Sequence, residues 1–214
     1  MKRNKTSNWF MILVLVLPLL VFGLVKLFEF HFQPLPYYGK SYQQQDSIHA
    51  YQVTPFKFTN QDGKEITGDF ISDKIWVACY FFTTCPSICP KMIAGMGEVQ
   101  ERFKNEKGLR MVSFTVDPEH DTPRILNDYA HVKSIDTKQW SLVTGNKTEL
   151  YRYARKELKL VATDGDGGPQ DFIHSDRLVL IDKENHIRGY YDGTEQSEVK
   201  QLMHDIESLL TINN

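Results

Sequence analysis

The sequence predicts an α/β domain with a central mixed sheet and helices on both faces, preceded by one N-terminal transmembrane helix. The first observation is the order of the predicted elements, ββ-βα-βα-βα-ββ-α, which places helices against a sheet. The second is that stretches 75–82 and 109–116 are almost wholly apolar, as strands buried on both faces are. The third is a long uncharged run near the N-terminus. No internal repeat or second folded domain is indicated.

The N-terminal segment is predicted to be a membrane anchor. Residues 9–25 carry no charge and follow three basic residues. A bilayer core needs about 20 apolar residues, so residues 27–28 must extend the run while Lys26 reaches the interface. The basic residues ahead of the run predict that the N-terminus stays inside and the rest of the chain outside. A cleaved signal peptide is disfavoured because only bulky residues follow the run. We assign residues 1–28 to the anchor, 29–50 to a tether and 51–214 to the folded domain.

Turn and cap residues define the elements of the domain. Asp62-Gly63 predicts a hairpin turn. Thr122-Pro123 has the N-cap and first-turn residues of a helix, and Asn146 with Glu149 resembles a capping box. The stretch 162–170 is glycine-rich and acidic, without periodicity, and is predicted to be a loop. The predicted strands are 53–59, 65–67, 75–82, 109–116, 140–143, 177–181 and 186–191, and the predicted helices are 88–103, 122–131, 146–158 and 195–210.

Composition excludes some classes of function. Outside the anchor, 21 Lys and Arg stand against 27 Asp and Glu, a net charge of about −6. This balance gives no basic face for nucleic acid. Three cysteines do not indicate a disulfide framework, and Cys79, inside the strand at 75–82, is expected to be a small buried apolar residue.

The most informative motif is the cysteine pair Cys85 and Cys89, in the stretch YFFTTCPSICP at residues 80–90. Thiols four residues apart on a helix lie on one face, and a helix N-terminus favours the thiolate, which is both nucleophile and metal ligand. The pair therefore either binds a soft metal or cycles between dithiol and disulfide. A structural disulfide is geometrically possible, because helical Cα atoms four apart lie about 6 Å from each other. It would close so short a loop that it gains little stability.

Three separated motifs resemble the Sco/SenC family. They are the stretch at 80–90, the stretch FTVDPEHDTP at 114–123, and His174-Ser175 ahead of a strand. They occur in the family's order, and the resemblance covers roughly residues 53–211. It implies a thioredoxin-like three-layer fold and a copper-binding protein. Such proteins assist assembly of the dinuclear copper site of cytochrome c oxidase, as copper donor, as thiol reductant of that site, or both.

The resemblance also implies a ligand set. Cys85, Cys89 and His174 would bind one copper ion, Cu(I) or Cu(II), with Asp117 in a supporting position. The donor chemistry agrees, because thiolates and imidazole suit copper and three ligands are few for a closed zinc site. Among seven histidines, His120 is the only serious rival to His174, since its loop follows a neighbouring strand. Asp117 is equally consistent with a role in forming the turn.

The runner-up is an enzyme of the same fold: a thiol–disulfide oxidoreductase or peroxiredoxin-like protein that uses Cys85 and Cys89 as its redox pair. The three-residue spacer between the cysteines, and Ile173-His174 where thioredoxins have a cis-proline, argue against a thioredoxin. Thr83 lies two residues before Cys85, whereas a peroxidase needs a threonine three residues before.

The expected location and partners follow from the anchor and the resemblance. The short basic N-terminus lacks the features of a transit peptide, which favours a bacterial inner membrane with the C-terminal domain in the periplasm. The implied partner is the copper-binding subunit of cytochrome c oxidase. Other periplasmic copper chaperones or thiol reductants are further candidates.

Overall fold

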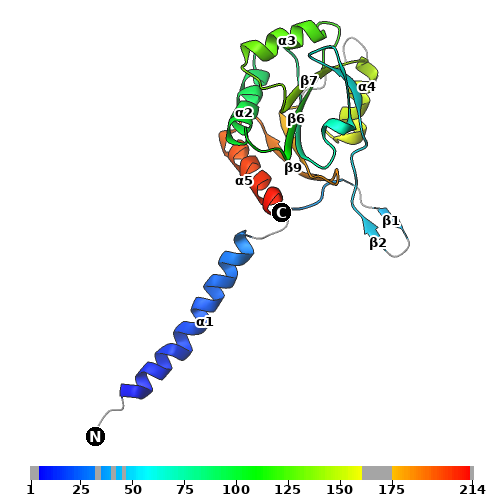
Figure 1. Ribbon diagram of the computed structural model, residues 1–214. Helices are drawn as coiled ribbons and strands as arrows, with labels where there is room; N and C mark the ends of the chain where they lie inside the picture. Colours follow the sequence, from blue (N-terminus) through cyan, green and yellow to red (C-terminus); the bar gives the residue numbers. More distant parts are fainter. Residues whose placement is uncertain (1–4, 32–34, 40–41, 45–46, 161–174, 213–214) are drawn as a thin grey trace. The chain divides into compact units, whose positions relative to one another are not determined.

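The computed structural model in Figure 1 describes residues 5–31, 35–39, 42–44, 47–160 and 175–212. The chain divides into two compact units, residues 1–35 and 36–214. The first unit contains one helix, α1 (Lys5–His31), which covers most of the predicted anchor and has Pro18 in its interior. The predicted transmembrane helix is not supported: none of the helices in the described part of the chain has both the length and the apolarity needed to cross a bilayer.

The second unit is built on a mixed sheet, as predicted. Within the described residues this sheet has seven strands in the order β4-β3-β7-β6-β5-β8-β9. Strands β5, β6 and β7 run parallel, and the flanking strands pair antiparallel on both sides. The strands are β3 (Lys57–Asn60), β4 (Glu65–Thr67), β5 (Ile75–Phe81), β6 (Leu109–Thr115), β7 (Trp140–Thr144), β8 (Arg177–Ile181) and β9 (Ile187–Asp192).

Helices cover both faces of the sheet, which also agrees with the prediction. They are α2 (Ile88–Arg102), α3 (Pro123–Val132), α4 (Lys147–Arg152) and α5 (Gln196–Ile212). Alternate residues of β5 point to opposite faces. Tyr80 belongs to a buried cluster with Leu150 of α4. The ring of Phe81 packs against that of Tyr129 of α3, with 5.6 Å between the ring centres. Every residue of β5 is buried, so this strand is the centre of the core.

The predicted caps and turns account for most element boundaries. The hydroxyl of Thr122 accepts the N–H of Ile125 at 3.4 Å, and Asn146 accepts that of Glu149 at 3.1 Å. The predicted helix 146–158 is divided, because α4 passes into a π-helical turn, η2 (Tyr153–Glu157), in which the N–H of Leu158 donates to the Tyr153 carbonyl. A 3-10 turn, η1 (Gly68–Phe70), follows β4.

Two features lie in the stretch predicted to be a tether. Strands β1 (Tyr42–Gln44) and β2 (Ser47–His49) form a small antiparallel hairpin. The preceding segment is fastened to the β8–β9 end of the sheet: Tyr38 N–H donates to the Ile187 carbonyl at 2.9 Å. Arg188 donates to the Pro36 carbonyl and to Asp182, and its guanidinium lies 4.1 Å from the centre of the Tyr37 ring. The first residues of this unit are therefore attached at the β8–β9 turn.

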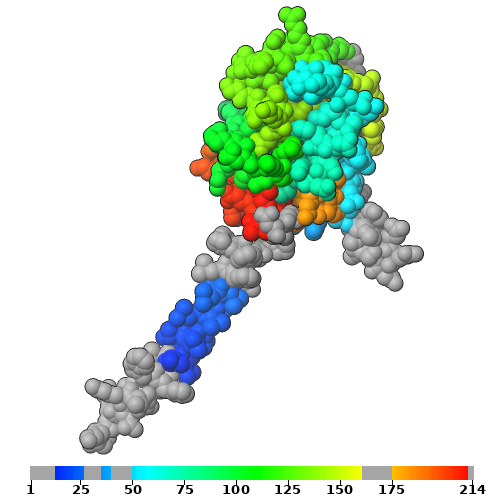
Figure 2. Space-filling model, viewed as in Figure 1, coloured from blue at the N-terminus to red at the C-terminus, as the bar shows by residue number. Residues whose placement is uncertain are grey.

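Helices α2 and α5 pack closely against each other, and Figure 1 shows them side by side. In the space-filling view α5 (red) lies directly beneath the green segments of the same unit (Figure 2). Gly95 allows the close approach, because a Cβ atom there would lie 2.9 Å from a methyl group of the buried Val199. A Cβ atom on Gly97 would meet nothing within 4 Å. The helix that carries Cys89 is thus held by a contact that requires glycine.

We expect Gly95→Ala and Gly97→Ala to change stability in opposite directions. Gly95→Ala should lower the free energy of unfolding by about 1–3 kcal/mol, because the contact with α5 becomes overpacked. Gly97→Ala should raise it by roughly 0.5–1 kcal/mol, because alanine is the better helix former and the space is open. Urea unfolding followed by circular dichroism measures both. Equal effects of the two substitutions would contradict this account of the α2–α5 contact.

Candidate metal and thiol site

The two cysteines of the motif lie at the carboxyl end of β5 but in different local structures. Cys89 is in the first turn of α2, whereas Cys85 precedes the helix in a turn closed by its own N–H to the Phe82 carbonyl at 3.2 Å. The expectation that both lie on one helix face is therefore wrong, because α2 begins only at Ile88. The turn, and not helical spacing, brings the sulfurs together. Both cysteines are free thiols.

The sulfur of Cys85 serves as the acceptor at the N-terminus of α2. Ser87, the N-cap residue, makes no capping hydrogen bond through its side chain. Interactions of the Cys85 sulfur with the Cys89 thiol and with the backbone N–H groups of Ser87 and Cys89 lower the pKa of Cys85. The Ser87 hydroxyl lies 4.0 Å from the same sulfur. Orphan N–H groups at a helix N-terminus stabilise a negative charge, so this arrangement favours the Cys85 thiolate.

The two thiols consequently have very different acidities. Burial alone would raise the pKa of Cys85, but the hydrogen bonds to its sulfur outweigh that effect and lower its pKa below the ordinary cysteine value. Burial, and then donation to Cys85, raises the pKa of Cys89 to about 12. Cys85 is therefore the more acidic thiol of the pair, and Cys89 is the buried thiol that retains its proton.

A buried carboxylate, Asp121, joins the cysteine loop to the loop after β6. Asp121 is fully buried and accepts the Thr83 N–H at 3.2 Å and the Thr83 hydroxyl at 2.5 Å. It also accepts the Thr115 hydroxyl at 2.5 Å, and the Nδ1 atom of His120 lies 3.0 Å from it. Sequence reasoning missed Asp121. The sequence does contain a feature that could have indicated Asp121. It is an acidic residue directly before a Thr-Pro helix start, and threonines follow or end the two preceding predicted strands.

The other candidates occupy distinct positions. Asp117 forms the turn: its N–H donates to Thr115, and its carbonyl accepts the N–H groups of His120 and Asp121 at 3.1 and 2.8 Å. Cys79 is buried as expected, 3.1 Å from the Ser113 hydroxyl. His174 lies outside the described residues. Tyr129 of α3 completes the surroundings, and burial raises its pKa to about 12.

A second group of potential metal ligands lies at the β8–β9 turn. Suitable atoms of Asp182, Glu184 and His186 all lie within 4.8 Å of one another. The Asp182 carboxylate, however, already accepts the N–H groups of Glu184 and His186 and an N–H of Arg188. These hydrogen bonds close the β8–β9 hairpin turn, and the turn accounts for the closeness of the three side chains.

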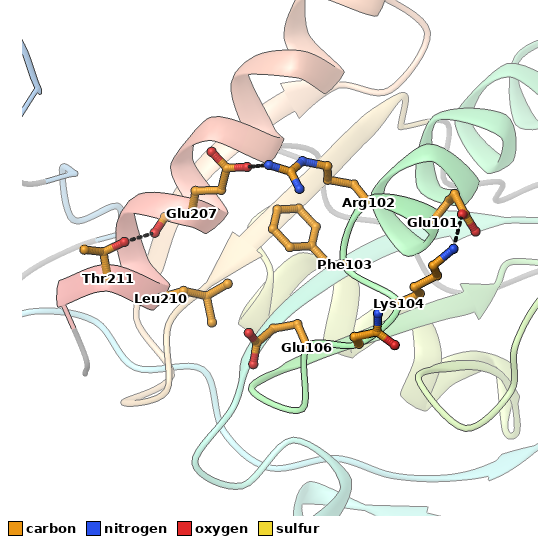
Figure 3. A pocket seen from close by; sticks show the side chains of 9 residues that line it. Glu101, Arg102, Phe103, Lys104, Glu106, Glu207, Leu210 and Thr211 are labelled. Atoms are coloured by element: carbon orange, nitrogen blue, oxygen red, sulfur yellow. Dashed lines mark hydrogen bonds and ion pairs between the residues drawn. The ribbon is translucent and has the colours of Figure 1, made fainter.

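A hollow of about 550 Å³ lies at the C-terminal ends of α2 and α5 (Figure 3). Ion pairs border it: Arg102 pairs with Glu207 at 2.5 Å and Lys104 with Glu101 at 2.6 Å. Cys89 lies at the opposite end of α2, roughly 20 Å away along a helix that rises 1.5 Å per residue. This hollow therefore does not serve the thiol pair.

Comparison with known proteins assigns the chain to a family. The family model described as SCO1/SenC matches residues 44–211. The chain belongs to the SCO1/SenC family. A Sco relative, the SCO1 protein homolog of Bacillus subtilis (strain 168), is 32% identical over 164 residues, which are 76% of this chain and 84% of the relative.

Solved Sco structures share the fold. The SCO1/SenC family lipoprotein from Bacillus anthracis gives a TM-score of 0.66 at 30% identity, covering 75% of this chain and 95% of that one. BsSco is described as a member of the Sco family of cytochrome c oxidase assembly proteins with a disulfide switch. It gives a TM-score of 0.64 at 32% identity, over 76% of this chain and 95% of BsSco. Bradyrhizobium japonicum ScoI with copper bound gives 0.59 at 21% identity, covering 74% and 99%, a likeness in fold alone. The Sco relatives confirm the predicted thioredoxin-like fold.

We expect the two thiols to react with iodoacetamide over different pH ranges. Cys85 should be alkylated first, with a half-maximal rate at a pH below the ordinary cysteine pKa of about 8.5. Cys89→Ala removes a hydrogen-bond donor, so the Cys85 pKa and this midpoint should rise, while Cys89→Ser should shift them less. The measurement is the alkylation rate of each cysteine against pH, by peptide mass spectrometry. Cys79→Ala is the control and should leave the midpoint unchanged. Alkylation of Cys89 before Cys85 would contradict the assignment.

Proposed function

We propose that this chain is a copper-binding assembly protein that binds one copper ion through Cys85, Cys89 and His174. The observation that carries the proposal is the pair of free, unequal thiols at the start of α2 in a chain of the SCO1/SenC family. Copper is bound to the related ScoI of B. japonicum, which supports copper as the metal. Soft thiolates with one imidazole are the donors that copper prefers among such sites.

Sheet topology supports His174 as the third ligand. Strand β8 runs antiparallel to β5, with Val179 opposite Ala78, so the N-terminal end of β8 lies at the same sheet edge as the end of β5. Ser175 is buried just ahead of β8, and the Gly193 N–H holds the Asp176 carbonyl at 2.8 Å. Ser175, the first described residue ahead of β8, therefore lies at the edge where Cys85 lies, and His174 is its neighbour in the sequence.

The pKa values of the two cysteines determine which proton must leave when copper binds. Cys85 offers a thiolate directly, whereas Cys89 must lose the proton that it donates to Cys85. Metal binding to a protonated thiol releases that proton. The apparent copper affinity should thus increase with pH below the pKa of Cys89, by about tenfold per pH unit for one released proton.

Copper titration of the reduced full-length chain in detergent, without oxygen, tests the ligand set. We expect one copper per chain and a thiolate-to-Cu(II) charge-transfer band that disappears in Cys85→Ser and Cys89→Ser. His174→Ala should weaken binding by more than the roughly 10–100-fold cost of losing an outer partner. His204→Ala, an exposed position on α5, is the matched control and should bind like the wild type. Unchanged copper binding by His174→Ala would show that His174 is not a ligand. A wild-type chain that binds no copper would overturn the proposed function.

A thiol–disulfide oxidoreductase is the second candidate, and the unequal acidities favour it. A thiolate next to a protonated thiol is the arrangement that attacks a disulfide and then resolves the mixed disulfide. In this role Cys85 would attack a partner disulfide, and Cys89 would release the partner as it closes the Cys85–Cys89 bond. Cys85 and Cys89 would suffice for this chemistry, and His174 would be dispensable.

The proposed partner is the copper-binding subunit of cytochrome c oxidase, since BsSco belongs to a family of cytochrome c oxidase assembly proteins. In cells with Cys85→Ser we expect oxidase activity to fall. Recovery with added copper indicates that delivery dominates, and recovery with a membrane-permeant thiol indicates that reduction dominates. The His204→Ala strain is the control. Full oxidase activity in the Cys85→Ser strain would contradict this partner.

We also propose that the N-terminal segment attaches the domain to the bacterial inner membrane, with residues 51–214 in the periplasm. The support is that the described apolar side chains between Leu13 and Val25 are exposed along α1, and that the B. anthracis relative is a lipoprotein. Retention of the chain in the membrane pellet after alkaline carbonate washing is the expected result. Release into the supernatant would contradict attachment by an inserted segment.

A further inference from the structure

His120, on the loop next to the cysteine turn, is held in a geometry typical of metal-binding histidines. Its Nδ1 atom lies 3.0 Å from an oxygen of Asp121 and 3.4 Å from the Thr83 hydroxyl. Asp121 is fully buried, whereas 46% of the His120 side chain is exposed. One edge of the imidazole is therefore fixed by buried protein, and the ring as a whole is accessible from solvent.

The hydrogen bonds define which ring nitrogen is available. The Asp121 oxygen that faces His120 already accepts the Thr83 hydroxyl, so it serves as an acceptor and Nδ1 of His120 donates to it. In the neutral ring Nε2 then holds the free lone pair. Histidines that bind metals almost always donate their second nitrogen to a carboxylate or carbonyl, which fixes the tautomer and raises the basicity of the ligand. His120 with Asp121 meets that description.

The loop of His120 is also close to Cys85. Strands β5 and β6 are parallel neighbours with Phe81 opposite Thr115, so their carboxyl ends meet at one edge. Thr83, which contacts both His120 and Asp121, is two residues before Cys85. Two residues of chain span at most about 7 Å. His120 and Cys85 therefore lie on neighbouring loops at the same edge of the sheet, joined through Thr83.

We propose that His120 is a copper-capture ligand: its Nε2 atom binds the incoming ion and passes it to the thiol pair. The proposal rests on the proposed function, because it needs the pair to be the copper site. The step is ligand exchange without a change of oxidation state. The Nε2–Cu bond breaks as the bond to the Cys85 sulfur forms, and the Cys89 proton goes to water when the second sulfur binds. Asp121 and Thr83 act as positioning residues for the ring.

The test is the rate of copper loading into the reduced full-length chain in detergent, measured anaerobically by stopped flow through the charge-transfer band. We compare the wild type with His120→Gln, in which the amide N–H can still donate to Asp121 but the imidazole is lost. His131→Gln, an exposed position in the last turn of α3, is the control. We expect loading to slow by about tenfold or more in His120→Gln alone. The final stoichiometry should stay at one copper per chain.

A second measurement isolates capture from the thiols. In a Cys85→Ser/Cys89→Ser/His174→Ala chain, the electron paramagnetic resonance spectrum of one equivalent of added Cu(II) should show nitrogen coupling that is lost when His120→Gln is added. If His120→Gln loads at the wild-type rate while still binding one copper, capture by His120 is wrong and the proposed function stands. If the wild-type chain takes up no copper, both proposals fail.

Discussion

The parallel pairing of β5 with β6 is the constraint on which the rest of the molecule depends. Seven consecutive residue pairs join the two strands, from Ile75 with Leu109 to Phe81 with Thr115. Both strands are buried almost throughout, so neither can shift without exposing apolar surface on two faces. Because they run in the same direction, the loops that follow them meet at one edge. The cysteine turn and the turn at Asp117 are neighbours for that reason.

At this edge, hydrogen bonding replaces apolar packing as the means of fixing the chain. The carboxylate of Asp121 accepts hydrogen bonds from Thr83, two residues after β5, and from Thr115, the last residue of β6, so one buried group orders both loops. Four donors around a buried carboxylate offset the cost of removing it from water. Ser87 does not cap α2 through its side chain, and the backbone N–H groups of Ser87 and Cys89 instead contribute to the lowered pKa of Cys85. The reactive group therefore lies where a helix N-terminus favours negative charge.

Sequence reasoning recovered the elements whose signals are local. Thr122-Pro123 and Asn146 begin helices because capping depends on adjacent residues, and apolar runs such as 75–82 predict buried strands. It failed where tertiary contacts decide. The helix begins at residue 88 as predicted, but the expectation that both thiols lie on it was wrong, because Cys85 lies in a turn closed by Phe82. Asp121 was missed because its donors, Thr83 after β5 and Thr115 at the end of β6, are neighbours only in the folded sheet.

Tyr37 and Tyr38 attach at the β8–β9 turn, at the end of the sheet opposite to the two thiols. That turn lies beyond Ile181, opposite Trp76 near the start of β5, whereas the thiols follow the end of β5. The seven residues of β5 separate the two sites by about 23 Å at 3.3 Å per residue. The polypeptide therefore enters this unit at one end of β5 and carries its reactive sulfur at the other, so the residues that fasten the start of the unit form no part of the thiol site.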